Sequence, residues 1–270
     1  MNDHTDDVTP SRRRCAVAVL GGPTTVIDIA GHRIVVDPTF DPPGPHAHLT
    51  KTAGPAVDVS ALGAVDLVLI SHDEHLDNLD HAGRALTLSA PRILTNPGAA
   101  QRLGPPADGM APWQTIDLDG LRVQAVPATH GPAGGDRDAS GNVNCEVTGF
   151  VLSGRGLPTI YVSGDNASLA TVSAIARTVG AIDVAVLFVG AARVPQKQGG
   201  RSLTLTSARA AAAAEVLAPR LVVAAHLDSW AHFTEGMADV VAAFEDAGIG
   251  PVLDRTPHGR WTGLEHLLDV

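Results

Sequence analysis

The chain is poor in aromatic residues and in basic charge, and each shortage excludes a class of protein. Its 270 residues include five Phe, three Trp and one Tyr, which leaves few side chains for stacking on nucleic-acid bases. Lysine and arginine total 19 against 29 acidic residues, a formal net charge of −10, and the only basic run is Arg12–Arg14. Binding to nucleic acid normally needs a basic surface, so no nucleic-acid partner is expected.

Cysteine is equally scarce, since Cys15 and Cys145 are the only two. Two thiols cannot build a disulfide framework or a four-thiolate zinc site, and we expect both to be buried apolar residues. No apolar run approaches the roughly 20 residues of a membrane-spanning helix. The polar start, MNDHTDDVTPSRRR, has no apolar signal-peptide core. These absences predict a cytoplasmic protein with no membrane partner.

The chain does contain ample material for a hydrophobic core, at 44% hydrophobic residues. Residues 1–14 are expected to form a disordered leader, and residues 15–270 a single domain. Apolar, β-branched segments alternate with helical ones, which predicts an α/β fold with helices outside layered sheets. The predicted strands are 15–20, 24–29, 32–36, 65–70, 121–126, 147–152, 159–163, 182–189 and 221–225, and the predicted helices are 166–179, 204–218 and 234–247.

A segment rich in metal-binding groups follows one of these strands directly. Residues 71–80, SHDEHLDNLD, contain two histidines and several carboxylates. Imidazole nitrogen and carboxylate oxygen are donors that zinc, iron and manganese accept. Open α/β sheets place ligands at the carboxyl ends of their strands, where this segment lies. Taken alone, the segment could equally be a solvated acidic loop.

Three later residues strengthen the metal hypothesis. His130, Asp165 and His226 each come just after a predicted strand. A single histidine at a strand end is more often a structural residue. Four donor-bearing strand ends in one layered domain should converge on one edge, and together they predict a metal site.

The order of these motifs resembles the metallo-β-lactamase superfamily. That family has a His-x-His-x-Asp-His loop, a distant His, a Gly-Asp after a strand and a final His. More narrowly, the chain resembles the ascorbate-6-phosphate-lactonase-like branch over about residues 15–268. The resemblance implies a four-layer αβ/βα sandwich with a metal site at the shared edge of its two sheets. The segments that carry it are LGGPTT (20–25), VDPTFD (36–41), SGDN (163–166) and HLDSWAHFTE (226–235).

The chain departs from the family loop in two places. His72 and His75 are separated by two residues, where the family has one. An alignment anchored on His75 puts Asp73 in the place of the first histidine, whereas one anchored on the strand end makes His72 the ligand. We favour His72, because imidazole suits a zinc-like ion better than a further carboxylate. The second departure is Asn78, which replaces the last histidine of the loop with a poor zinc ligand.

The resemblance implies one or two divalent ions per chain. The implied ligands are His72, His75 and His130 for a first ion and Asp77 and His226 for a second, with Asp165 bridging the two. Zinc is the expected metal. Asn78 should weaken the second ion, leaving a mononuclear site or one that prefers manganese or iron, with Asp73 as a replacement ligand.

The expected activity is metal-dependent hydrolysis of a small-molecule substrate. A divalent ion lowers the pKa of bound water to about 7. Asp77 would orient or deprotonate that water, and His232 would act as a general acid or bind an anionic group. A lactone or other cyclic ester is the first candidate substrate, and a phosphoester is the second. The loop at residues 39–56, which contains His46, His48 and Lys51, could form a lid.

Other functions are weighed against hydrolysis. A superfamily member that has lost catalysis and serves as a binding or scaffold protein would explain Asn78 and the extra loop residue. A nuclease is disfavoured by the net charge of −10. A redox di-iron site is disfavoured because Leu76 stands where its motif needs an aspartate. Relatives in this branch often self-associate, so a homo-oligomer is open, although no apolar stripe marks an interface.

Overall fold

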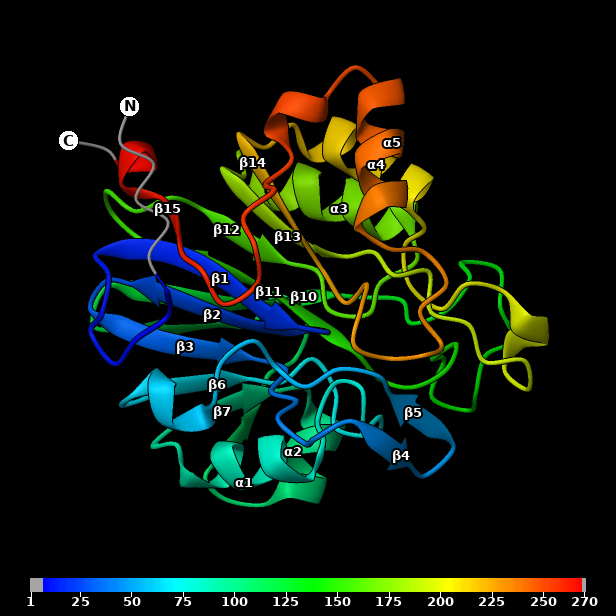
Figure 1. Ribbon diagram of the computed structural model, residues 1–270, viewed down its shortest axis with the longest axis horizontal. Coiled ribbons are helices and arrows are strands. Elements are labelled where there is room, and N and C mark those ends of the chain that lie inside the picture. Colours follow the sequence, from blue (N-terminus) through cyan, green and yellow to red (C-terminus); the bar gives the residue numbers. More distant parts are fainter. Residues whose placement is uncertain (1–6, 269–270) are drawn as a thin grey trace.

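Two β-sheets pack face to face, with helices on both outer sides, in the computed structural model, which describes residues 7–268 (Figure 1). The first sheet has seven strands in the order β15-β1-β2-β3-β6-β7-β8, and the second has six in the order β14-β13-β12-β11-β10-β9. Helices α1 and α2 lie beside the first sheet, and α3, α4 and α5 cover the second (Figure 1). This confirms the predicted α/β fold, a four-layer αβ/βα sandwich.

The first sheet and its neighbours occupy the first half of the chain. Its strands are β1 (Cys15–Gly21), β2 (Thr24–Ile29), β3 (His32–Val36), β6 (Leu67–Leu69), β7 (Ile93–Thr95), β8 (Ala107–Gly109) and the late β15 (Thr262–Gly263). A separate hairpin is formed by β4 (Gly44–His46) and β5 (Leu49–Lys51), and the helices are α1 (His81–Ser89) and α2 (Pro97–Leu103).

The second sheet and its helices follow. The strands are β9 (Thr115–Leu118), β10 (Leu121–Pro127), β11 (Thr148–Ser153), β12 (Ile160–Val162), β13 (Val184–Phe188) and β14 (Leu221–Ala225). The helices are α3 (Leu169–Val179), α4 (Ser207–Leu217) and α5 (Met237–Asp246). All nine predicted strands and all three predicted helices are present, with the helices starting three residues later than predicted. The N-cap of α4 is Thr206, whose side chain accepts from the Arg209 N–H, and α5 begins after Gly236.

The core fills the space between the sheets. In β1 the residues alternate: Cys15, Val17 and Val19 belong to the cluster between the sheets, and Ala16 and Ala18 to the cluster on the outer face. Both faces of this strand are therefore covered, which explains its unbroken apolar run.

Strand direction decides where the loops converge. In the first sheet β3, β6, β7 and β8 run parallel, and in the second sheet β12, β13 and β14 run parallel. The carboxyl ends of parallel strands share one edge of a sheet. The loops after β3, β6, β12 and β14 therefore meet at the edge where the two sheets come together.

Residues 7–14 differ from the expected disordered leader. Val8 is buried, and its N–H donates to the Gly259 carbonyl at 2.8 Å. The buried guanidinium of Arg33 donates to the carbonyls of Thr9 and Ser11. These donors fix the segment against the first sheet, which its polar composition did not predict. Residues 1–6 of the expected leader lie outside the described residues.

Within residues 7–268, no helix is long and apolar enough to cross a membrane.

Candidate metal centre

The predicted metal ligands come together at the shared edge of the two sheets. Each lies in the segment that follows a strand with buried apolar residues, so its polar side chain emerges at the edge. The loop after β6 supplies three residues, and β10, β12 and β14 supply one each: His72, His75, Asp77, His130, Asp165 and His226. Five of the six side chains are buried and His75 is partly buried.

Three histidines form the first cluster. Nδ1 of His75 lies 2.9 Å from Nε2 of His72 and 3.0 Å from Nε2 of His130. The sulfur of Cys145 joins this group, with all four candidate ligand atoms within 4.8 Å of one another. His130 is oriented by its Nδ1, which is 3.1 Å from the Leu203 carbonyl oxygen. Such an outer hydrogen bond fixes the ring so that Nε2 faces the cluster.

Two aspartates and a histidine form the second cluster. Nε2 of His226 lies 3.4 Å from Oδ2 of Asp77 and 3.4 Å from Oδ1 of Asp165. The other oxygen of Asp165, Oδ2, lies 3.5 Å from Nε2 of His130 in the first cluster. Asp165 therefore presents one carboxylate oxygen to each cluster, the geometry that a bridging ligand needs.

The donor atoms of both clusters fit a divalent cation. Buried polar atoms in proteins are nearly always hydrogen-bonded. Here both ring nitrogens of His226 and Oδ2 of Asp165 are buried without a hydrogen-bond partner. Borderline nitrogen and hard oxygen donors, aimed at common points in a water-poor setting, match zinc, manganese or iron.

The protonation of the site favours cation binding. Burial lowers the pKa of His75 and of His130 to about 4, so both rings are neutral and keep a free lone pair at pH 7. Burial would raise the pKa of Asp77, but the nearby His226 ring and the hydrogen bond with His232 outweigh burial and hold that pKa well below its usual range. Asp77 is thus ionised. A cation would compensate a carboxylate that is otherwise buried.

Asp73, the alternative first ligand, is turned away from both clusters. Its Oδ1 accepts from the Arg102 guanidinium at 2.6 Å, and Oδ2 lies 3.7 Å from Arg84. These ion pairs hold the carboxylate against α1 and α2, so the geometry favours His72 over Asp73. The loop accommodates its extra residue by exposing Glu74, which forms an ion pair with Arg102.

Asn78 lies beside the second cluster, in contact with its carboxylate Asp165. Its Nδ2 donates to Oδ2 of Asp37 at 3.1 Å and to Oδ1 of Asp165 at 3.0 Å. Asp37 also accepts from the N–H and the hydroxyl of Ser71, at 2.6 Å each. Asn78 and Asp37 therefore orient Asp165 and the loop after β6. Asp37 therefore has a structural role.

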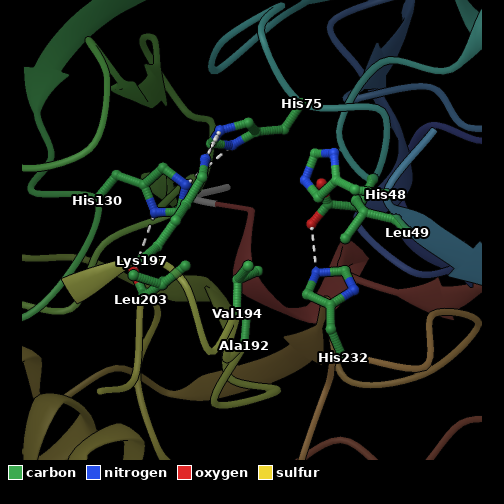
Figure 2. Close-up of a pocket in the computed structure, with 10 residues that line it drawn as sticks. His48, Leu49, His75, His130, Ala192, Val194, Lys197, Leu203 and His232 are labelled. Carbon is green, nitrogen blue, oxygen red and sulfur yellow. Dashed lines mark hydrogen bonds and ion pairs between the residues drawn. The ribbon is translucent and has the colours of Figure 1, made fainter. Parts of the chain in front are cut away.

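A pocket of about 270 Å³ opens over the clusters, which we call the inner pocket (Figure 2). It is lined by His48, Leu49, His75, Asp77, His130, Ala192, Val194, Lys197, Leu203 and His232. Nε2 of His232 lies 2.9 Å from Oδ2 of Asp77 and faces the pocket, in the position expected of a proton donor or anion-binding group (Figure 2). An outer groove continues from it, sharing His48, Leu49 and His232.

The expected lid at residues 39–56 is anchored in its second half. The N–H of Thr52 donates to the Ser229 carbonyl at 2.7 Å, and the N–H of Ala231 donates to the Thr50 carbonyl at 3.0 Å. Lys51 is buried and bonded to Asp80 at 2.8 Å. Only His48 of the three basic residues in this loop lines the pocket. The segment is a fixed wall.

Sequence reasoning missed two residues at the site. Cys145 was expected to be an inert buried residue; it is buried, and it also lies among the three histidines. Lys197 reaches His75 from the loop between β13 and α4, with Nζ 2.9 Å from Nε2. Both residues lie inside long loops, and neither has a spacing that could have marked it.

Comparison with known sequences agrees with this geometry. The family described as "Beta-lactamase superfamily domain" matches residues 32–227. A metal-dependent hydrolase of Methanosphaerula palustris is 31% identical over 170 residues, which cover 61% of this chain and 69% of the relative. One from Pyrococcus abyssi is 29% identical over 170 residues, which cover 62% and 68%.

Comparison with solved structures agrees as well. The isothiocyanate hydrolase from Delia radicum gut bacteria superposes with a TM-score of 0.80 at 20% identity, covering 92% of this chain and 99% of that one. A diiron β-hydroxylase from Streptomyces venezuelae gives a TM-score of 0.68 at 16% identity, covering 94% and 55%. At these identities the likeness shows the fold, which is therefore shared by proteins of different chemistry.

Proposed function

Because this chain belongs to the metallo-β-lactamase superfamily and is a metal-dependent hydrolase, we propose that it hydrolyses a small cyclic ester or a phosphoester in the inner pocket. The single observation that carries the proposal is Asp165, whose two oxygens face the two donor clusters. A carboxylate so placed supports two ions held side by side, which is the arrangement of many hydrolytic sites. Zinc is the proposed metal, since the first cluster is built from imidazoles.

When bound, the metal would supply an activated water and polarise the scissile group. His72, His75 and His130 would hold one ion, and Asp77, Asp165 and His226 would hold the other. Five of these six side chains are buried and already brought together, so little reorganisation is needed on binding.

The remaining chemistry is proposed for Asp77 and His232. The ionised Asp77 faces the pocket and accepts a proton from, or orients, the attacking water. Nε2 of His232 lies 2.9 Å from Oδ2 of the same carboxylate, and His232 would donate a proton to the leaving oxygen. The small inner pocket fits a compact scissile group such as that of a cyclic ester.

The test is hydrolysis by zinc-loaded protein of a panel of lactones and phosphoesters. We expect turnover of at least one class, with kcat lowered about a hundredfold or more by Asp77→Asn and by a smaller factor in His232→Gln. Arg255→Met, at an exposed ion pair far from the pocket lining, serves as the unchanged control. Turnover that is unaffected by Asp77→Asn would contradict the assigned site, and none in either class would contradict the substrate proposal.

A further inference from the structure

Among the residues that the structure describes, Lys197 is the only lysine or arginine that lines the inner pocket. The chain has just one other lysine, Lys51, which is buried against Asp80. The Lys197 ammonium reaches Nε2 of His75 at 2.9 Å, and among residues 7–268 it has no ion pair with a carboxylate. Its backbone is fixed by the turn in which its N–H donates to the Val194 carbonyl at 2.9 Å. A charged side chain is thus held in the pocket without a counter-charge.

The contact with His75 is incompatible with a loaded site. Nδ1 of His75 faces His72 and His130, so a cation held by the three rings takes Nδ1. The neutral ring then carries its proton on Nε2. An ammonium group has only donors, so it cannot bond to that N–H. Lys197 therefore needs a different hydrogen-bond acceptor when a cation is bound by the three histidines.

The described residues that line the pocket offer Lys197 no replacement for this acceptor. Asp77 is the only carboxylate among the described residues that line the inner pocket and the outer groove. Its Oδ2 already lies 3.4 Å from Nε2 of His226 and 2.9 Å from Nε2 of His232. The groove adds the exposed Arg193 and no acidic residue. A chain with a net charge of −10 thus places two cationic side chains, Lys197 and Arg193, at this entrance. Such an entrance attracts anions.

From these contacts, and resting on the proposed function, we propose that Lys197 binds an anionic group of the substrate, so that the enzyme acts on esters that carry a second carboxylate or phosphate. Lys197 and His232 line opposite sides of the inner pocket (Figure 2). The anionic group is held on the Lys197 side, and the scissile group lies between Asp77 and His232. Lys197 is a specificity residue and takes no part in bond cleavage.

The first experiment compares two esters that differ by one carboxylate, 4-nitrophenyl hemisuccinate and 4-nitrophenyl butyrate, on zinc-loaded protein. Lys197→Met should lower kcat/KM for the hemisuccinate about tenfold to a hundredfold and leave the butyrate within about twofold. Arg201→Met removes the same charge from the same loop outside the pocket and should change neither. Lys197→Arg should recover part of the loss. Equal effects of Lys197→Met on both esters would overturn the proposal.

The second experiment does not depend on turnover. Acetic anhydride acetylates accessible amines, and Lys51 is buried, so Lys197 is the expected lysine target in zinc-loaded protein. Millimolar succinate or phenylphosphonate should slow acetylation of Lys197 about fivefold relative to a lysine-containing reference peptide in the same sample, measured by peptide mass spectrometry, while benzyl alcohol should not. The anion effective at the lower concentration distinguishes a carboxylate from a phosphate substrate.

The two experiments separate the two claims. Protection of Lys197 without hydrolysis of either ester would uphold the anion site and count against ester hydrolysis. Hydrolysis of both esters without protection by either anion would uphold the hydrolase and overturn the role of Lys197.

Discussion

His226 differs from the other histidines of the metal centre in its charge environment. Burial would lower its pKa, but the carboxylates of Asp165 and Asp77 outweigh burial and raise it. His75 and His130 show the opposite balance, because burial dominates and brings each pKa to about 4. Protons therefore compete with a cation for the second cluster at a higher pH than for the first.

This difference predicts that the two ions leave in order as the pH falls. Dialysis of zinc-loaded protein at stepped pH from about 7.5 to 4, followed by elemental analysis, should show the second ion lost at a higher pH than the first, which is retained until the pH nears 4. Circular dichroism at each step checks that the fold persists. Loss of both ions in a single step would contradict the assignment of His226 to a separate cluster.

At the scale of elements, the anchored wall at residues 39–56 depends on one buried ion pair. Asp80 caps α1 by accepting from the Gly83 N–H, and it also accepts from Lys51 at 2.8 Å and from the N–H groups of Phe40 and Asp41. This single carboxylate joins β5 and the loop after β3 to the start of α1, directly behind the metal-binding loop.

Removal of one partner should therefore be costly. Lys51→Met leaves the Asp80 charge buried and should lower the free energy of unfolding by about 3 kcal/mol in urea denaturation. Arg255→Met, which breaks the exposed pair with Glu245, should cost less than about 1 kcal/mol. Similar costs for the two variants would show that the buried pair does not anchor the wall.

The elements that sequence reasoning missed are the short ones. Strands such as β13 are buried on both faces and therefore appear as unbroken apolar runs. By contrast, α1 has Gly83 in its first turn, where an added Cβ would lie 1.8 Å from the Pro38 carbonyl oxygen. That glycine is required by close packing against Pro38, 45 positions earlier in the sequence. A local pattern cannot show such a requirement, so the helix was not predicted.

At the scale of the whole molecule, the site could be predicted where strand order determines position. The six predicted ligands meet because their strands end at one edge, and each position could be read from the apolar run before it. Cys145 and Lys197 come from the loops at 128–147 and 190–206, whose paths depend on tertiary packing. Their arrival at the histidine cluster could be found only in three dimensions.

The central claim is that the two donor clusters bind metal, and its most direct test is the metal content of the chain. The measurement is elemental analysis of protein purified without chelator or affinity metal and reconstituted with zinc, manganese or iron, beside Asp165→Ala. The account predicts about two ions per chain in the wild type and a loss in the variant that lacks the bridging carboxylate. Essentially no bound metal in the reconstituted wild-type protein would contradict it.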